Sequence, residues 1–245
     1  WTKIGNDIYG EKNFDYSGQS ISLSADGSVV AIGSWINDSN GENSGHLRIY
    51  RNVNNTWTQV GGDIRGEAAY DYLGYSVSLS DDGNIVAIGA MGNDGSNGLG
   101  FDKGHIRILQ NINDNWTQIG NDIEGETFGD SLGYSVSLSS DGSIVAVGAT
   151  TNDGNGNVSG HVSIFKNVNN TWTQVGSDID GEAAFDYSGY SVSLSNDGSV
   201  VAIGAPYNDG NGTNSGHVSI FKNFNNTWTQ IGSDIDGEAS NDISG

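Results

Sequence analysis

The sequence predicts an all-β protein, a β-propeller built from four-stranded antiparallel blades. The first observation is a repeat, because the phrase Trp-Thr-x-[Ile/Val]-Gly-x-Asp-Ile begins at Trp1, Trp57, Trp116, Trp172 and Trp228, at intervals of 56 or 59 residues. The second is that each interval holds several short apolar or alternating segments, separated by turns rich in Gly, Asn and Asp. The third is that no segment shows the 3.6-residue apolar period of a helix.

The first two strands of each repeat are predicted to form a hairpin. In the last complete repeat, residues 190–195 alternate apolar residues with Ser, and Asn196-Asp197-Gly198 follows. Asp-Gly between two apolar runs is a strong hairpin signal. The second strand, residues 199–205, is apolar on both faces. We therefore expect a neighbour on each side of it.

The third and fourth strands complete the unit. They are predicted at 217–222 and 228–232, with an Asn-rich loop between them. Four short strands in about 56 residues match the size of a propeller blade. A β-solenoid usually has a shorter repeat, and a string of separate sheets would leave two apolar faces of each sheet uncovered. Neighbouring blades cover both faces, and we expect the recurring Trp to pack between them.

The chain is predicted to be one propeller domain, residues 1–245. Its repeats cover 1–56, 57–115, 116–171 and 172–227, with a partial repeat at 228–245. The Trp strand occurs five times and the other strands four times, so one Trp strand, Trp1–Ile8 or Trp228–Ile235, is surplus. Three explanations stay open: a four-bladed ring with a spare strand, a fragment of a longer array, or a strand that pairs with another chain.

These residues resemble the FG-GAP type of repeat, known from the integrin alpha-chain propeller. The resemblance rests on 189–195 with Asp197-Gly198, on 201–206 and on 216–221, and it recurs in each repeat. It implies a propeller, a secreted or cell-surface setting, and adhesion or ligand binding instead of catalysis. The family's calcium loop, Asp-x-Asp-x-Asp-Gly, is absent from turns such as Asp81-Asp82-Gly83. Its hairpin calcium sites therefore do not carry over.

Composition excludes several classes of partner. The chain has 30 acidic and 9 basic residues, a net charge of −21, which disfavours DNA, RNA and anionic lipid. No apolar run approaches the roughly 18 residues of a spanning helix, so no membrane insertion is expected within this chain. It has no Cys, which excludes disulfides and cysteine-ligated metals.

Much of the acidic charge is predicted to lie on one face. Strand order places the loops between strands four and one, and those between strands two and three, at the same end of the blades; we call this end the loop face. Gly-rich loops with many oxygen atoms suit calcium, the one candidate cofactor. The candidate ligands are the Asn-Asp carboxylates Asp38, Asp94, Asp153 and Asp209. The competing interpretation is that these side chains cap turns.

Two further groups on this face are candidate ligand-binding residues. Trp35 and Tyr207 could stack on a sugar ring, or they could pack locally at the base of their loops. The acidic candidates come from the loops between strands four and one: Glu67, Asp71, Glu126, Asp130, Glu182 and Asp186.

Four histidines follow Gly and open the third strand of each blade: His46, His105, His161 and His217. Equivalent residues of different blades should lie too far apart to share one metal ion. We expect each ring to hydrogen-bond to a loop carboxylate or carbonyl within its own blade, with side chains of the Glu182 or Asp186 type as the candidate carboxylates.

The sequence favours a non-catalytic function. No Gly-x-Ser-x-Gly elbow occurs, and near-identical repeats give no asymmetric pair of acid and base. The expected function is an extracellular or cell-surface adhesion module whose acidic loop face binds a protein, a glycan or a divalent cation. Two alternatives stay open: a subunit of an extracellular filament, sheath or matrix that self-associates through unpaired terminal strands, and a lectin-like propeller.

Overall fold

The structure, a computed structural model, describes residues 1–94 and 102–245 of the chain. Within these two ranges all regular structure is β, and the strands form four antiparallel sheets, each a blade. This confirms the predicted all-β class and the propeller-type blade. Within the same ranges, no helix has the length and apolar character needed to cross a membrane.

Each blade contains four main strands in chain order and one strand of two residues. Blade 1 has β1 (Ser20–Leu23), β2 (Val29–Ser34), β3 (His46–Val53), β4 (Thr56–Gln59) and β5 (Ile64–Arg65). Blade 2 has β6 (Ser76–Leu79), β7 (Ile85–Ala90), β8 (His105–Ile112), β9 (Asn115–Gln118) and β10 (Ile123–Glu124). Blade 3 has β11 (Leu132–Leu138), β12 (Ile144–Ala149), β13 (His161–Val168), β14 (Thr171–Gln174) and β15 (Ile179–Asp180). Blade 4 has β16 (Ser191–Leu194), β17 (Val200–Ala205), β18 (His217–Phe224), β19 (Thr227–Gln230) and β20 (Ile235–Asp236).

The fifth strand of each blade was not predicted. In blade 4, β19 pairs with the second half of β18, and β20 pairs with its start, His217 and Val218. The outer edge of the blade is therefore shared between two short segments. Two residues are too few to show an alternating pattern.

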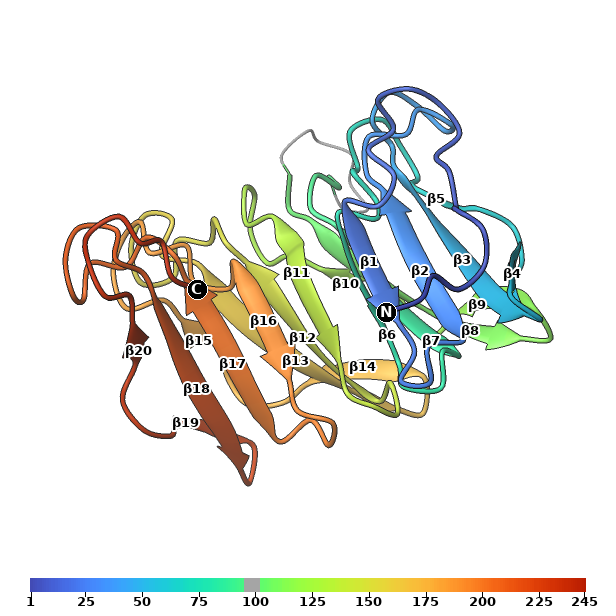
Figure 1. The fold of residues 1–245 in the computed structure, drawn as a ribbon. Helices are drawn as coiled ribbons and strands as arrows, with labels where there is room; N and C mark the ends of the chain where they lie inside the picture. The colour runs from blue at the N-terminus through green and yellow to red at the C-terminus, as the bar shows by residue number, and fades with distance from the viewer. Residues whose placement is uncertain (95–101) are drawn as a thin grey trace.

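The four blades follow one another along an arc, with β1, β6, β11 and β16 on its inner side (Figure 1). Each of these inner strands packs beside the next. The Trp-containing strands β4, β9, β14 and β19 lie on the outer side (Figure 1).

Three apolar cores lie between successive blades. In the first, Ala31 and Ile49 of blade 1 pack with Leu79, Val86 and Ile88 of blade 2. The same arrangement joins blade 2 to blade 3 and blade 3 to blade 4. Burying these side chains contributes roughly 25 cal/mol per Å² of apolar surface removed from water. The second strand is thus buried on both faces where a blade has two neighbours, as its sequence predicts.

The recurring Trp joins neighbouring blades at their outer edge. Trp116 is half-buried against the first core, and its indole Nε1 donates to the Val60 carbonyl oxygen at 3.0 Å. Trp172 and Trp228 repeat this contact with the carbonyls of Ile119 and Val175, at 2.9 and 2.7 Å. Its predicted packing role is confirmed, although each ring stays partly exposed.

The surplus Trp segment is the N-terminal one. Residues 1–8 form no strand, and Trp1 is fully exposed. The carbonyl of Ile4 accepts a hydrogen bond from Trp57 Nε1 at 3.2 Å. The segment therefore occupies, beside blade 1, the position that Val60 occupies beside blade 2. All four blades have their own Trp strand.

Candidate functional site

The two loop types meet on one face, as predicted. In the blade 1 to blade 2 connection, Asn40 Nδ2 donates to the Gly66 carbonyl at 2.7 Å, and Tyr70 N donates to the Glu42 carbonyl at 2.7 Å. Asn211 makes the same bond to Gly237 at 2.9 Å. The loop face is therefore held together by contacts between its own loops.

The Asn-Asp carboxylates close the loops in which they occur. Asp38 Oδ1 accepts from Asn43 N at 2.8 Å, and Asp209 Oδ1 accepts from Asn214 N at 2.8 Å. Asp153 does the same with Val158 N at 2.7 Å. These bonds are those of turn-capping side chains. Calcium binding by these carboxylates and Asp94 stays a prediction.

A second set of loop carboxylates is buried. Asp71 is 3% exposed and accepts from Ala68 N at 2.8 Å and from Asn93 Nδ2 at 3.2 Å. Burial raises the pKa of Asp71, against the effect of these hydrogen bonds. Asp130 and Asp186 are equally buried and cap their loops in the same way. Because these carboxylates are buried, they stabilise the loops and have little exposed surface for a ligand.

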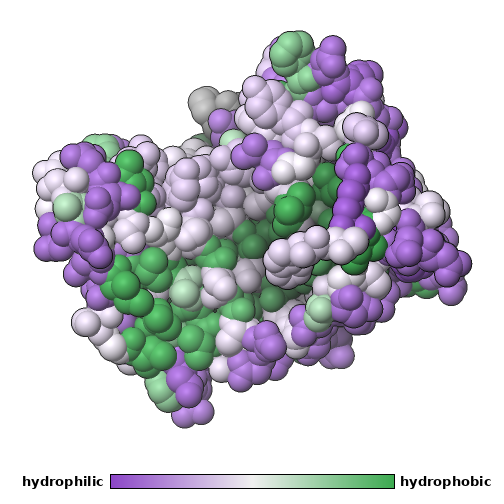
Figure 2. All heavy atoms as spheres, in the orientation of Figure 1, coloured by the Kyte–Doolittle hydropathy of each residue, from purple (hydrophilic) through white to green (hydrophobic). Residues whose placement is uncertain are grey.

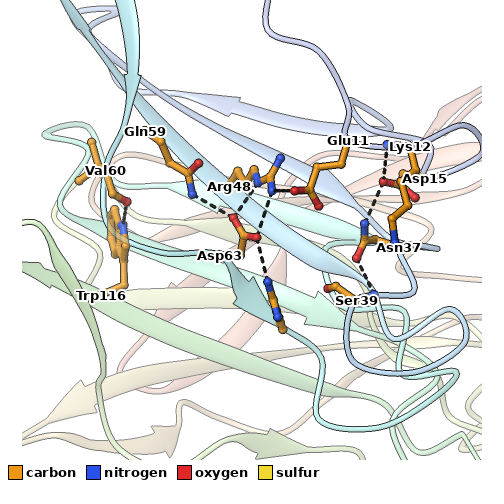
Figure 3. A network of polar contacts seen from close by, with 11 residues as sticks. Glu11, Lys12, Asp15, Asn37, Ser39, Arg48, Gln59, Val60, Asp63 and Trp116 are labelled. Atoms are coloured by element: carbon orange, nitrogen blue, oxygen red, sulfur yellow. Dashed lines mark hydrogen bonds and ion pairs between the residues drawn. The ribbon is translucent and has the colours of Figure 1, made fainter.

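An arginine lies between two carboxylates in blades 1 and 2. Figure 3 shows Arg48 between Glu11 and Asp63, with Arg48 Nε 2.7 Å from Asp63 Oδ1. The hydrogen bond from Arg48 holds the pKa of Asp63 well below its usual range. In blade 2, Arg107 bridges Glu67 and Asp122 in the same way, at 2.5 and 2.7 Å. The predicted ligand residue Glu67 is thus paired with a protein cation.

Serine replaces this arginine in blades 3 and 4. Ser219 Oγ donates to Asp234 Oδ1 at 2.5 Å, and Ser163 contacts Asp178 similarly. Glu182, His217 and Asp234 have ligand atoms within 4.8 Å of one another. These three side chains could hold a metal ion, because no arginine stands in their blade at the position of Arg48. The predicted ligand residue Glu126 lies in the loop between β10 and β11, where its backbone carbonyl accepts a hydrogen bond from Lys103 Nζ at 3.4 Å.

The histidines differ from the prediction. The hydroxyls of Ser163 and Ser219 lie 3.4 Å from Nε2 of His161 and His217, where a loop carboxylate or carbonyl was expected. Among residues 1–94 and 102–245, no hydrogen-bond partner is found for the buried atoms His46 Nδ1 and His105 Nε2. Burial lowers the pKa of both rings, which favours their neutral form. The carboxylates do lie close, but they bind arginine or serine in preference to the imidazole.

A row of aromatic rings crosses the blades. Trp35 lies 5.3 Å from Tyr72 and 5.4 Å from Tyr75, measured between ring centroids. Tyr75 lies 5.0 Å from Tyr134, which lies 4.9 Å from Tyr190. Tyr75, Tyr134 and Tyr190 belong to the repeated Gly-Tyr-Ser. Tyr75 and Tyr190 directly precede β6 and β16, and Tyr134 lies within β11. The contact between the three copies was not predicted, because it joins side chains about 56 residues apart in different blades.

One end of this row opens into a pocket. The pocket has a volume of about 560 Å³ and spans blades 2 to 4 on the loop face. Its aromatic walls are Tyr134, Phe185, Tyr187, Tyr190 and Tyr207, and its polar lining includes Ser131, Thr150, Thr151 and Asn214. The predicted ligand residue Tyr207 is therefore part of a pocket, with its ring 5.1 Å from Tyr187. Trp35 lies apart from the pocket, packed among Tyr16, Tyr72 and Tyr75.

Comparisons with known proteins support the repeat and the fold. Residues 177–221 match the model of the FG-GAP repeat, which confirms the resemblance in that segment. No curated protein matches the chain. Among solved structures, the chain is similar to the hydrazine synthase of Kuenenia stuttgartiensis, with 12% identity, a TM-score of 0.55, and coverage of 94% of this chain and 51% of that one. It is also similar to the periplasmic gluconolactonase of Pseudomonas aeruginosa, with 14% identity, a TM-score of 0.59, and coverage of 89% and 57%. The chain thus spans slightly more than half the length of each.

These matches correct the predicted function. Both solved structures are named as enzymes, which contradicts the prediction of a non-catalytic module. Nothing in the three comparisons supports an adhesion, filament or lectin role. The prediction of no catalysis rested on the symmetry of near-identical repeats. The pocket is asymmetric: Tyr207, Thr150 and Met91 occupy equivalent positions or adjacent ones in the loops after β17, β12 and β7.

Proposed function

We propose that the aromatic pocket binds a small hydroxylated ring compound of the sugar-lactone class as a substrate. The observation that carries the proposal is the pocket itself, in which five aromatic side chains face a few hydroxyl and amide groups. The substrate class is suggested by the name of the gluconolactonase, whose fold this chain shares.

The size and lining of the pocket suit such a compound. A volume of about 560 Å³ lies in the range of small-molecule sites, roughly 300–1,000 Å³. A sugar-like ring has apolar C–H faces and polar edges. Tyrosine offers a matching combination, an apolar ring face and a hydroxyl at its tip. The ring would therefore pack on the aromatic walls, with its hydroxyl groups directed to the threonine and asparagine side chains.

The hydroxyl of Tyr134 is suited to donate a hydrogen bond. Burial raises the pKa of Tyr134, and hydrogen bonds with Tyr190 and Tyr75 raise it further. The hydroxyl therefore stays protonated at neutral pH. When water adds to a lactone carbonyl, negative charge develops on the carbonyl oxygen before the ring C–O bond breaks and the hydroxy acid forms. A protonated tyrosine that donates to this oxygen would stabilise that charge.

Binding and turnover test the proposal together. Calorimetric titration with freshly dissolved glucono-1,5-lactone should give saturable binding, and a pH-stat should detect acid release above the spontaneous rate. Tyr190→Ala and Tyr207→Ala should each weaken binding about tenfold or more, because each removes a wall of the pocket. Both side chains are partly exposed, so the fold should be kept.

Tyr9→Ala is the matched control, because Tyr9 is exposed and outside the pocket. It should leave binding and acid release unchanged. Absence of saturable binding by the unaltered protein would overturn the proposal, and so would pocket variants that bind as well as the control.

A further inference from the structure

Two apolar blade faces are uncovered, one at each end of the arc. We call the face toward the preceding blade the leading face and the face toward the following blade the trailing face. Leu23, on the leading face of blade 1, is 57% exposed, whereas its equivalent Leu79 in blade 2 is 7% exposed. Ile235, on the trailing face of blade 4, is 57% exposed, whereas Ile123 of blade 2 is 6% exposed. Figure 2 shows the apolar surface that results over β16, β17 and β18.

The residues on the two uncovered faces are equivalent to the residues that are buried between the blades inside the chain. On the leading side, Leu23 and Val30 of blade 1 correspond to pairs that are buried in the other blades: Leu79 and Val86, Leu138 and Val145, Leu194 and Val201. On the trailing side, Ala202 and Ile220 of blade 4 correspond to Ala31 and Ile49, Ala87 and Ile108, Ala146 and Ile164. The chain therefore carries both halves of an interface that it forms three times internally.

Polar contacts across the internal junctions repeat as well. Ser22 Oγ of blade 1 accepts from Leu79 N of blade 2 at 2.9 Å. The same bond joins Ser78 to Leu138 N and Ser137 to Leu194 N, both at 3.0 Å. Ser193 is the next member of this series; it is exposed on β16, and Leu23 N is the matching donor on blade 1. An incoming blade 1 would thus find its hydrogen-bond partner in place.

We propose that a second copy of this chain docks its blade 1 against blade 4 of the first copy, head to tail. The three internal junctions indicate the occupant, because the leading face of blade 1 carries the same residue types that the trailing faces pack against inside the chain. A contact of this kind joins two different surfaces, so it either closes into a ring or continues.

The N-terminal segment now occupies part of the place that the second copy would take. Ile4 O now accepts the hydrogen bond of Trp57 Nε1, in the position where Val60, Ile119 and Val175 act in the internal junctions. In the docked state the partner's Ile231 carbonyl would take this bond. Residues 1–8 would then leave the edge of blade 1.

Sedimentation velocity over a range of concentrations tests the proposal at about 0.15 M salt, where the repulsion between two chains of charge −21 is screened beyond ~8 Å. The unaltered chain should sediment above its monomer mass of 25.7 kDa. Leu23→Asp places a charge on the leading face of blade 1, and Ile220→Asp places a charge on the trailing face of blade 4. Each variant alone should therefore be a monomer. Their 1:1 mixture keeps one intact face of each kind and should form a heterodimer.

Val53→Asp is the matched control, because Val53 is an exposed apolar residue of β3 outside both blade faces. It should assemble like the unaltered chain. Ala202→Glu serves as a second trailing-face variant if circular dichroism shows that Ile220→Asp is unfolded. A monomer at every concentration would overturn the proposal, as would an assembly that the face variants leave unchanged or a mixture that stays monomeric.

Discussion

At the scale of single residues, arginine explains how two blades tolerate paired carboxylates. Arg107 is nearly buried and binds both Glu67 and Asp122. Hydrogen bonds to charged groups contribute about 1.5–3 kcal/mol, and a charge left without its partner adds a penalty. Serine occupies this position in blades 3 and 4, so the backbone accepts either residue.

Arg107→Ser should therefore lower the free energy of unfolding by about 1.5–3 kcal/mol, measured by urea denaturation at pH 7. Arg51→Ser is the matched control, because the pair Arg51–Asp114 is exposed and should contribute less than about 1 kcal/mol. Equal effects of the two substitutions would contradict the role assigned to Arg107.

The buried histidines predict a pH dependence of stability. Burial lowers the pKa of His46 and His105 in the folded state, so the unfolded chain binds protons first as the pH falls. Stability should therefore decrease as the pH falls below the unfolded value of about 6.5. The unfolding midpoint should be lower at pH 5.5 than at pH 7.5, and His105→Gln should reduce that difference. An unchanged difference would show that His105 does not cause it.

The role of a side chain could be predicted where its hydrogen-bond partner lies in the same loop. Turn capping was the competing interpretation of the Asn-Asp loops, and Asp38 and Asp209 make the bonds that this interpretation expects. The role could not be predicted where the partner comes from a distant segment. The pairing of Arg107 with Glu67 joins residues 40 positions apart, and no local pattern indicates it.

At the scale of elements, the recurring Trp links blades 2, 3 and 4 each to the blade before it. Trp116 combines apolar packing on the first core with the bond from Nε1 to the Val60 carbonyl. Trp116→Phe should keep most of the packing and lower the free energy of unfolding by about 1 kcal/mol. Trp116→Ala should cost about 3 kcal/mol, the lower end for a large aromatic, because the ring is partly exposed. Equal decreases in the free energy of unfolding of the two variants would contradict this separation of packing from hydrogen bonding.

The main strands were predictable because each has a periodic pattern and a clear turn beside it. The strands β16, β17, β18 and β19 lie within two residues of the expected ranges. The short strand β20 was not predictable, since its pairing with His217 and Val218 depends on the path of the preceding turn.

At the scale of the whole molecule, the repeat predicted blades that cover one another, and the three inter-blade cores confirm this. The repeat did not predict the pocket. Its lining draws on side chains that differ between blades, including Met91, Thr150 and Tyr207. Their meeting at one point depends on how blades 2 to 4 are placed along the arc, which no single repeat specifies.

The central claim is that this pocket receives a hydroxylated ring. Saturation-transfer difference NMR with 1,5-anhydroglucitol, a stable ring of this class, tests it most directly. Saturating the aromatic protons of the protein should transfer signal to the C–H groups of the ring compound, and Tyr190→Ala should remove most of that transfer. Absence of transfer with the unaltered protein, or equal transfer with Tyr190→Ala, would contradict the claim.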